Sequence, residues 1–100
     1  MKNTDAYLDL ETALTLLDTP KDVKNFLTDL CTPAELRALS ERWHVAQILD
    51  GGEKSYRDIQ AETGVSTTTI GRVARFLRDE PHGGYRAVLD KAVLKKKDKT

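Results

Sequence analysis

The residues with the chemistry to bind another molecule gather between Gly64 and Arg78, a stretch without any acidic side chain. In a helix that begins after Ser66, the outward positions carry hydroxyl groups, guanidinium groups and one glycine: Thr67, Thr68, Thr69, Gly71, Arg72 and Arg75. Short hydroxyl side chains allow close approach to base edges and phosphates, and a helix N-terminus favours an anion. Arginines that contact phosphate also release counterions, which drives binding. The pattern therefore predicts a helix face that binds DNA.

The residues around this face have the spacing of a helix-turn-helix, two helices joined by a tight turn. Ile59 is expected to pack inward from the first helix, and Gly64 to supply the positive φ that the turn needs. Val65 is expected to fill the turn, while Ile70 and Val73 anchor the second helix from beneath. This inward set leaves the threonines and arginines facing outward.

Two positions depart from the usual pattern of this motif. Gln60 follows Ile59 where alanine is common, and Thr63 stands where a larger apolar residue is usual. Two ordinary packed helices around a glycine turn would also give this spacing. An outer face of threonine and arginine, however, has no purpose in packing, so the sequence favours DNA binding.

Helical periodicity runs through almost the whole chain, and the alternation typical of strands is absent. The clearest helix start is Thr32-Pro33-Ala34-Glu35, where threonine and glutamate form a capping box and proline takes the first helical position. The other start signals are Thr19-Pro20, Ser55 and Ser66, and the breaks are Gly51-Gly52, Gly64 and Pro81-His82-Gly83-Gly84. With a first helix over roughly residues 4–18 and a last one from Tyr85, the sequence predicts an all-α fold of six helices.

The long helix that begins at Pro33 carries one apolar stripe, made of Leu36, Leu39, Trp43, Ala46 and Leu49. Residues three or four positions apart share a helix face, so a stripe of this kind faces a core or a partner helix. We therefore expect Trp43 to be a core or dimer-interface residue.

The net charge of zero hides an uneven distribution of charged side chains. Residues 1–35 hold seven acidic and three basic side chains, and residues 36–80 hold seven of each. Residues 81–100 hold two acidic and six basic side chains. Because local fields decide where a phosphate binds, a neutral chain of this kind is compatible with nucleic-acid binding.

Length and composition exclude several classes of protein. One hundred residues give room for one domain, which we expect over residues 1–94 with its helix-turn-helix over about 55–78. Residues 95–100 are expected to form a disordered basic tail.

Cys31 is the only cysteine, which excludes an internal disulfide and a cysteine zinc cluster. We find no catalytic constellation, metal-binding pattern or membrane span, and expect a cytoplasmic protein that is not an enzyme and has no cofactor.

The order of elements resembles the Trp repressor superfamily from about Leu30 to Leu89. The resemblance rests on residues that cap helices, turn the chain or carry positive charge: Leu30-Cys31-Thr32-Pro33-Ala34-Glu35, Leu39, Arg42, Ser55, Arg57, Gly64-Val65-Ser66, Thr69-Ile70 and Arg72. Gly83-Gly84-Tyr85, after the second helix of the motif, is similar to the YerC/YecD group of Trp-repressor-related proteins.

This resemblance implies an intertwined homodimer with two projecting helix-turn-helix heads. The heads of such dimers enter successive major grooves about 34–36 Å apart. Carried over residue by residue, the resemblance also implies a set of DNA-facing residues with Arg72 near phosphate: Arg57, Gln60, Thr67, Thr68, Thr69 and Gly71.

The resemblance also bears on a small-molecule effector. In the Trp repressor two arginines sandwich an indole, and both match residues of this chain, Arg42 and Arg72; Thr32 matches the start of the long helix. The family glycine after the second arginine is Val73 here, and the family serine three residues later is Phe76. Both larger side chains would fill the apolar space of the candidate effector pocket. We therefore do not expect L-tryptophan to be the effector, and the identity of any effector stays open.

The sequence thus predicts a transcription regulator, a repressor, that binds a near-palindromic operator in double-stranded DNA as a homodimer. The alternative is a helical protein-interaction module on the same scaffold, which the zero net charge and the acidic first third favour. DNA affinity that stays flat with salt would support that alternative. A third option keeps DNA binding and gates it with a molecule other than tryptophan.

Overall fold

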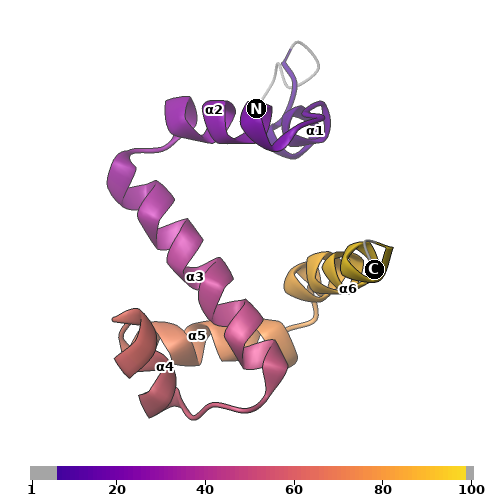
Figure 1. The fold of residues 1–100 in the computed structure, drawn as a ribbon. Coiled ribbons are helices and arrows are strands. Elements are labelled where there is room, and N and C mark those ends of the chain that lie inside the picture. The colour runs from indigo at the N-terminus through magenta and orange to yellow at the C-terminus, as the bar shows by residue number, and fades with distance from the viewer. Residues whose placement is uncertain (1–6, 99–100) are drawn as a thin grey trace. The chain divides into compact units, whose positions relative to one another are not determined.

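The computed structural model describes the backbone of residues 7–98 and the side chains of residues 7–93. Its elements, in chain order, are α1 (Leu10–Thr15), α2 (Pro20–Leu30), α3 (Pro33–Gly51), α4 (Tyr56–Thr63), α5 (Thr67–Arg78) and α6 (Gly84–Asp98) (Figure 1). No strand occurs within these described residues, which confirms the predicted all-α fold of six helices. The chain forms two compact units, one up to Arg37 and one from Ala38 onward.

The helix starts lie where their caps were predicted. The Thr19 hydroxyl accepts from the backbone N–H of Asp22 at 3.1 Å, with Pro20 as the first residue of α2. At the start of α3, the Thr32 hydroxyl accepts from the N–H of Glu35 at 3.1 Å, and the Glu35 carboxylate accepts from the N–H of Thr32 at 2.8 Å. This reciprocal pair is the predicted capping box, and it satisfies two backbone donors that the helix leaves free.

The first helix is shorter than the sequence predicted. Asp9 has an extended backbone, and its carboxylate accepts from the N–H of Thr12 at 2.9 Å, so α1 begins only at Leu10. It ends at Thr15, where the N–H of Leu16 donates to Ala13 at 3.1 Å. Residues 4–6 of the predicted helix lie outside the described residues.

Neither α1 nor α2 buries a residue within the chain. The large apolar side chains exposed on or beside them are Tyr7, Leu8, Leu10, Leu14, Leu16 and Leu30. Apolar side chains that recur at helical spacing need a surface to cover them.

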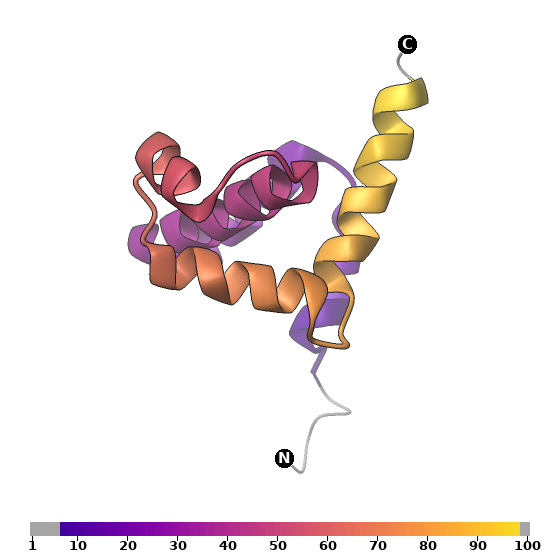
Figure 2. The same cartoon turned by 90° about the horizontal axis from the view of Figure 1, so that it is seen from below.

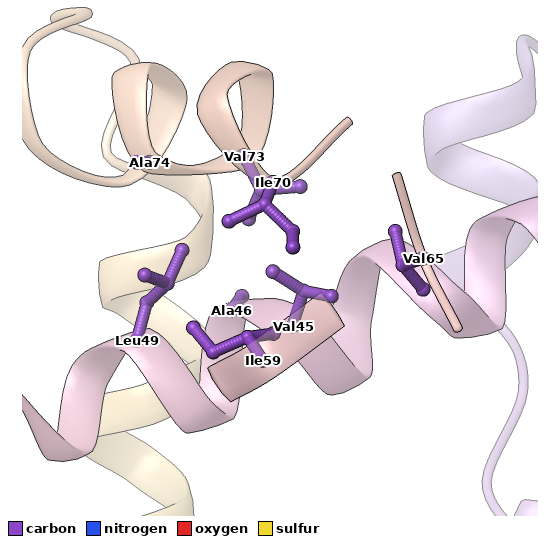
Figure 3. Packing of buried hydrophobic residues seen from close by; sticks show 8 residues of the cluster. All are labelled: Val45, Ala46, Leu49, Ile59, Val65, Ile70, Val73 and Ala74. Carbon is purple, nitrogen blue, oxygen red and sulfur yellow. The ribbon is translucent and has the colours of Figure 1, made fainter. Parts of the chain in front are cut away.

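The core of the second unit joins the second half of α3 to α4 and α5 (Figure 3). Its buried residues are Val45, Ala46, Leu49, Ile59, Val65, Ile70, Val73 and Ala74. The three inward residues predicted for the helix-turn-helix, Ile59, Ile70 and Val73, are buried together with its turn residue Val65, which agrees with the expected packing. This small core therefore fixes the rotation of α5 about its own axis, and so determines which of its residues face outward.

The buried face of α3 is rotated from the predicted stripe. Val45 is fully buried although it lies outside that stripe, while Leu39 is 42% exposed. Ala46 and Leu49 belong to both sets. The difference arises because α4 and α5 pack beside only the second half of α3, and this contact is not encoded in the periodicity of α3 itself.

Two arginines bind the C-terminal end of α3. The Arg78 Nη2 group of α5 donates to the Leu49 carbonyl at 3.2 Å. From α6, Arg86 donates to both Asp50 carboxylate oxygens at 2.7 and 3.3 Å and to Asp90 at 2.9 Å. The hydrogen bond from Arg86 holds the pKa of the Asp50 carboxyl below its usual value. These bonds satisfy a carbonyl and a carboxylate at a helix end, and so fasten α5 and α6 there.

The last helix runs further than the sequence predicted. The backbone of α6 stays helical to Asp98, through the first part of the expected tail, because leucine and lysine favour helix and no breaker follows Gly84. Residues 99–100 lie outside the described residues. On this helix Leu89 is buried, whereas Val88 is 53% exposed.

Gly64 provides a test of the turn. It adopts φ +77°, and a Cβ added there meets no atom within 4 Å, so Gly64→Ala changes backbone strain alone. We expect this change to lower the free energy of unfolding by about 1–2 kcal/mol, measured by urea denaturation at fixed protein concentration. The matched control is Gly51→Ala, where the added Cβ is equally unhindered but φ lies outside the left-handed region. Equal effects of the two changes would contradict a strained turn.

Candidate nucleic-acid interface

The helix α4 is fixed at its start by Ser55. The Ser55 hydroxyl accepts from the N–H of Asp58 at 3.1 Å, and the Asp58 carboxylate accepts from the N–H of Ser55 at 3.4 Å. Sequence reasoning identified Ser55 as the cap but not its partner Asp58. The signal was present as a serine followed by an acid three residues later.

The turn between α4 and α5 is held by hydrogen bonds on both sides of Gly64. The N–H of Gly64 donates to the Gln60 carbonyl at 2.8 Å. The Thr63 hydroxyl donates to the Ile59 carbonyl at 2.7 Å and accepts from the N–H of Val65 at 3.1 Å. This explains why threonine stands where the motif usually has a larger apolar residue: its hydroxyl satisfies two backbone groups of the turn.

The N-terminus of α5 presents two free threonines and one engaged threonine. Thr67 and Thr68 are exposed. Thr69 is half-buried, and its hydroxyl accepts from the Ser66 hydroxyl at 3.1 Å. Ser66 in turn accepts from the N–H of Thr69 at 3.1 Å and so caps the helix. One turn further, a Cβ added at Gly71 meets no atom within 4 Å, so the helix surface there is open.

The three arginines of α5 divide between two roles. Arg72 and Arg75 are exposed, and both guanidinium groups lie over the ring of Phe76, at 4.3 and 5.0 Å from its centroid. Arg78 instead donates to the Leu49 carbonyl of α3. The α5 face, which we define as the outward residues Thr67, Thr68, Gly71, Arg72 and Arg75, therefore carries two positive charges.

The helix α4 adds two more of the predicted residues. Arg57 and Gln60 are exposed on this helix, which lies at the N-terminal end of α5 (Figure 2). Lys54 and Glu62, beside them in the chain, form an exposed ion pair. The structure thus presents the predicted DNA-facing residues on one helix-turn-helix, with only Thr69 and Gly71 half-buried.

The residues predicted for an effector pocket have varied environments. Val73 is a core residue that is 1% exposed, and Phe76 is half-buried beneath the guanidinium group of Arg72. Arg42 is half-buried on α3. Thr32 belongs to the first unit, where it caps α3. The structure therefore brings together Arg72 and Phe76.

An open cavity of about 310 Å³, which sequence reasoning missed, is lined by Phe76, His82, Gly84 and Tyr85. The rings of Phe76 and His82 stack 6.0 Å apart, and Tyr85 stacks on Trp43 at 6.4 Å. Its volume is at the lower end of that of small-molecule sites, and its aromatic walls suit a flat apolar group. The clustering of a histidine, two glycines and a tyrosine after α5 was the available signal.

The described residues contain neither a candidate membrane span nor a candidate metal cluster. No helix in this part of the chain is both long and apolar enough to cross a membrane. Across the same residues, no three histidine, cysteine, aspartate or glutamate side chains gather in a way that could hold a metal ion.

Gly71 allows stability and binding to be separated. Gly71→Ala replaces a helix-interior glycine without a steric clash, so we expect the free energy of unfolding to rise by about 0.5–1 kcal/mol. The added methyl group also lies on the α5 face, where it would hold the helix back from a groove. We therefore expect weaker binding of duplex DNA, measured by fluorescence anisotropy, with Gly51→Ala as the control that leaves binding unchanged. Lower stability of Gly71→Ala would contradict the open surface.

Comparison with known proteins identifies the family. The family described as "Trp repressor protein" matches residues 6–93. "Uncharacterized protein YerC" of Bacillus subtilis is 42% identical over 66 residues, which cover 66% of this chain and 62% of YerC, less than two thirds of that protein. A crystal structure of a "TrpR like protein" from Eubacterium eligens superposes with a TM-score of 0.76 at 36% identity, covering 83% of this chain and 84% of the other. The chain therefore belongs to the Trp repressor family.

Proposed function

We propose that the chain is a cytoplasmic transcription regulator that binds a near-palindromic operator as a homodimer and represses by occupying promoter DNA. The observation that carries this proposal is the α5 face: hydroxyl and guanidinium groups on a helix that contains no acid and is fixed by its core and its turn, with Arg75 paired to Glu80 just beyond the helix. Membership of the Trp repressor family supports a helical DNA-binding regulator.

The exposure of each residue suggests its part in binding. Thr67, Thr68 and Gly71 lie along the front of α5, so we assign them to base edges in the major groove. Arg72 and Arg75 are exposed and positively charged, and are assigned to phosphates.

Three further assignments complete the proposed interface. Arg57 and Gln60, exposed on α4, are assigned to the DNA backbone beside the groove. The Thr69 hydroxyl already accepts from Ser66, so Thr69 contributes its methyl group to the surface more than its polar atom.

The proposed homodimer rests on the first unit. The helices α1 and α2 contain no fully buried residue, and Leu10, Leu14 and Leu30 on them are exposed. A chain this small gains much of its stability by burying further apolar surface. A second copy supplies a matching apolar surface by symmetry. The symmetry also provides the second head that a palindromic site requires.

Analytical ultracentrifugation tests the dimer. We expect the wild-type chain to sediment as two copies of 11.2 kDa. Leu14→Arg places a charge on the exposed apolar face of α1, and we expect it to shift the protein to single chains, since an unpaired charge is costly to bury. Asn25→Arg, which adds the same charge at an exposed polar position of α2, should remain dimeric. A wild-type protein that sediments as a single chain at all concentrations would overturn the dimer.

The proposed effector behaviour follows from Val73 and Phe76. Val73 contributes to the core, and Phe76 occupies the face of Arg72, so neither position offers space or a polar partner to an amino acid. We therefore propose that L-tryptophan does not control DNA binding. A different flat ligand has the aromatic cavity as its candidate site, and the stacking of Tyr85 on Trp43 gives that cavity a fluorescent reporter.

Selection from a random duplex library at physiological salt tests the DNA-binding proposal. We expect enrichment of a two-fold symmetric sequence with half-sites about one helical turn apart, and no change when L-tryptophan is added. Arg75→Ala should weaken binding to the selected duplex and reduce the slope of log affinity against log salt by about 1. Thr68→Ala should relax the sequence preference, whereas Lys91→Ala on α6 is the control for charge alone. Retention of no duplex, or affinity that is flat with salt, would favour a protein-interaction module instead.

A further inference from the structure

Phe76 is the only aromatic residue of α5, and it lies under two of the three arginines of that helix, Arg72 and Arg75. The Arg72 guanidinium, four residues earlier, is 4.3 Å from the ring centroid, and the Arg75 guanidinium is 5.0 Å away. Guanidinium groups are attracted to aromatic faces at such distances, and residues four apart on a helix are neighbours. The ring therefore contacts the two arginines that the proposed function assigns to phosphate.

The segment after α5 also contacts Phe76 and Arg75. The His82 ring stacks on Phe76 with centroids 6.0 Å apart. The Glu80 carboxylate accepts from Arg75 Nε at 3.1 Å, and the N–H of Glu80 donates to the Arg75 carbonyl at 3.0 Å. Because the backbone of Glu80 is itself bonded to the end of α5, its carboxylate restricts the motion of the Arg75 side chain.

The contacts leave particular donors available. A stacked guanidinium uses its face, while its N–H groups point outward in the plane of the group. On Arg75 the Glu80 carboxylate occupies Nε, so the two Nη groups remain for another acceptor. The Arg75 side chain is still 61% exposed, and an incoming phosphate can reach it.

We propose that Phe76 is a positioning residue of the DNA-binding surface, which holds Arg72 and Arg75 ready to donate to phosphates. This inference rests on the proposed DNA binding of the α5 face. An unrestrained arginine loses rotamer freedom when it binds, and that loss weakens affinity. Phe76 immobilises both side chains before DNA arrives. The aromatic ring, and not merely its apolar bulk, is the part that matters.

The test compares Phe76→Leu with Phe76→Tyr on the duplex selected above. Leucine keeps apolar contacts and removes the ring, so we expect a loss of affinity of roughly five- to thirty-fold, as for two arginines that must be ordered on binding. Tyrosine keeps the ring face, and Phe76 borders an open cavity. We expect its affinity to stay within about twofold of wild type, because the cation–π contacts survive.

A double-mutant cycle separates positioning from a structural role. In a chain that already carries Arg72→Ala and Arg75→Ala, Phe76→Leu should cause no further loss of affinity, since its effect passes through those arginines. If Phe76→Leu acted only through the structure, its loss of affinity would persist in that background. It would then also lower the melting temperature by the same amount in the wild-type chain and in the chain without the two arginines. The side-chain Nε–Hε resonances of Arg72 and Arg75 should also shift on Phe76→Leu without DNA, because the ring current is removed.

The outcomes distinguish this inference from the proposed function. If the wild-type chain binds the duplex and Phe76→Leu binds equally well, or its loss persists in the arginine-free background, positioning is overturned while DNA binding stands. If the wild-type chain binds no duplex, the proposed function fails and the inference fails with it. The inference is supported if Phe76→Leu weakens DNA binding and Phe76→Tyr does not, and if Phe76→Leu has no further effect in the chain without the two arginines.

Discussion

The geometry of the α5 face depends on one packing constraint, the small core that α4 and α5 share with the second half of α3. A helix that buries Ile70 and Val73 has no freedom to turn its other face inward. Ile59 and the left-handed Gly64 fix the angle at which α5 meets α4. The positions of the outward threonines and arginines therefore follow from apolar contacts that they do not make themselves.

The same packing separates the arginines of the second unit into two groups, those that bond to the end of α3 and those that stay on the outward face of α5. Arg78 and Arg86 come close to the C-terminal end of α3, where a free carbonyl and Asp50 accept their hydrogen bonds. Arg72 and Arg75 lie earlier on α5 and stack on Phe76, and Arg75 also donates to Glu80. A chain with no net charge can therefore keep an outward basic face, because most of its acids lie elsewhere or are paired.

Features encoded within a few residues could be predicted from the sequence, whereas features that depend on distant contacts could not. The caps at Thr19 and Thr32 and the turn at Gly64 need only local residues, and the structure has them where they were expected. The burial of Val45 and the bond of Arg78 to α3 need the packing of segments far apart in the chain. The candidate site was accordingly predictable as a set of outward residues, but not as stacked and restrained side chains.

The contacts of Phe76 bear on how such a regulator would be controlled. A ligand can shift DNA affinity only if it orders something that is otherwise mobile or favours one of two states. Here Arg72 and Arg75 rest on a ring from their own helix, and Val73 of the same helix is part of the core. On the proposed function, the recognition helix is therefore already prepared for DNA. If the proposed dimer also forms, DNA affinity depends on the concentration of the chain, because assembly supplies the second helix-turn-helix.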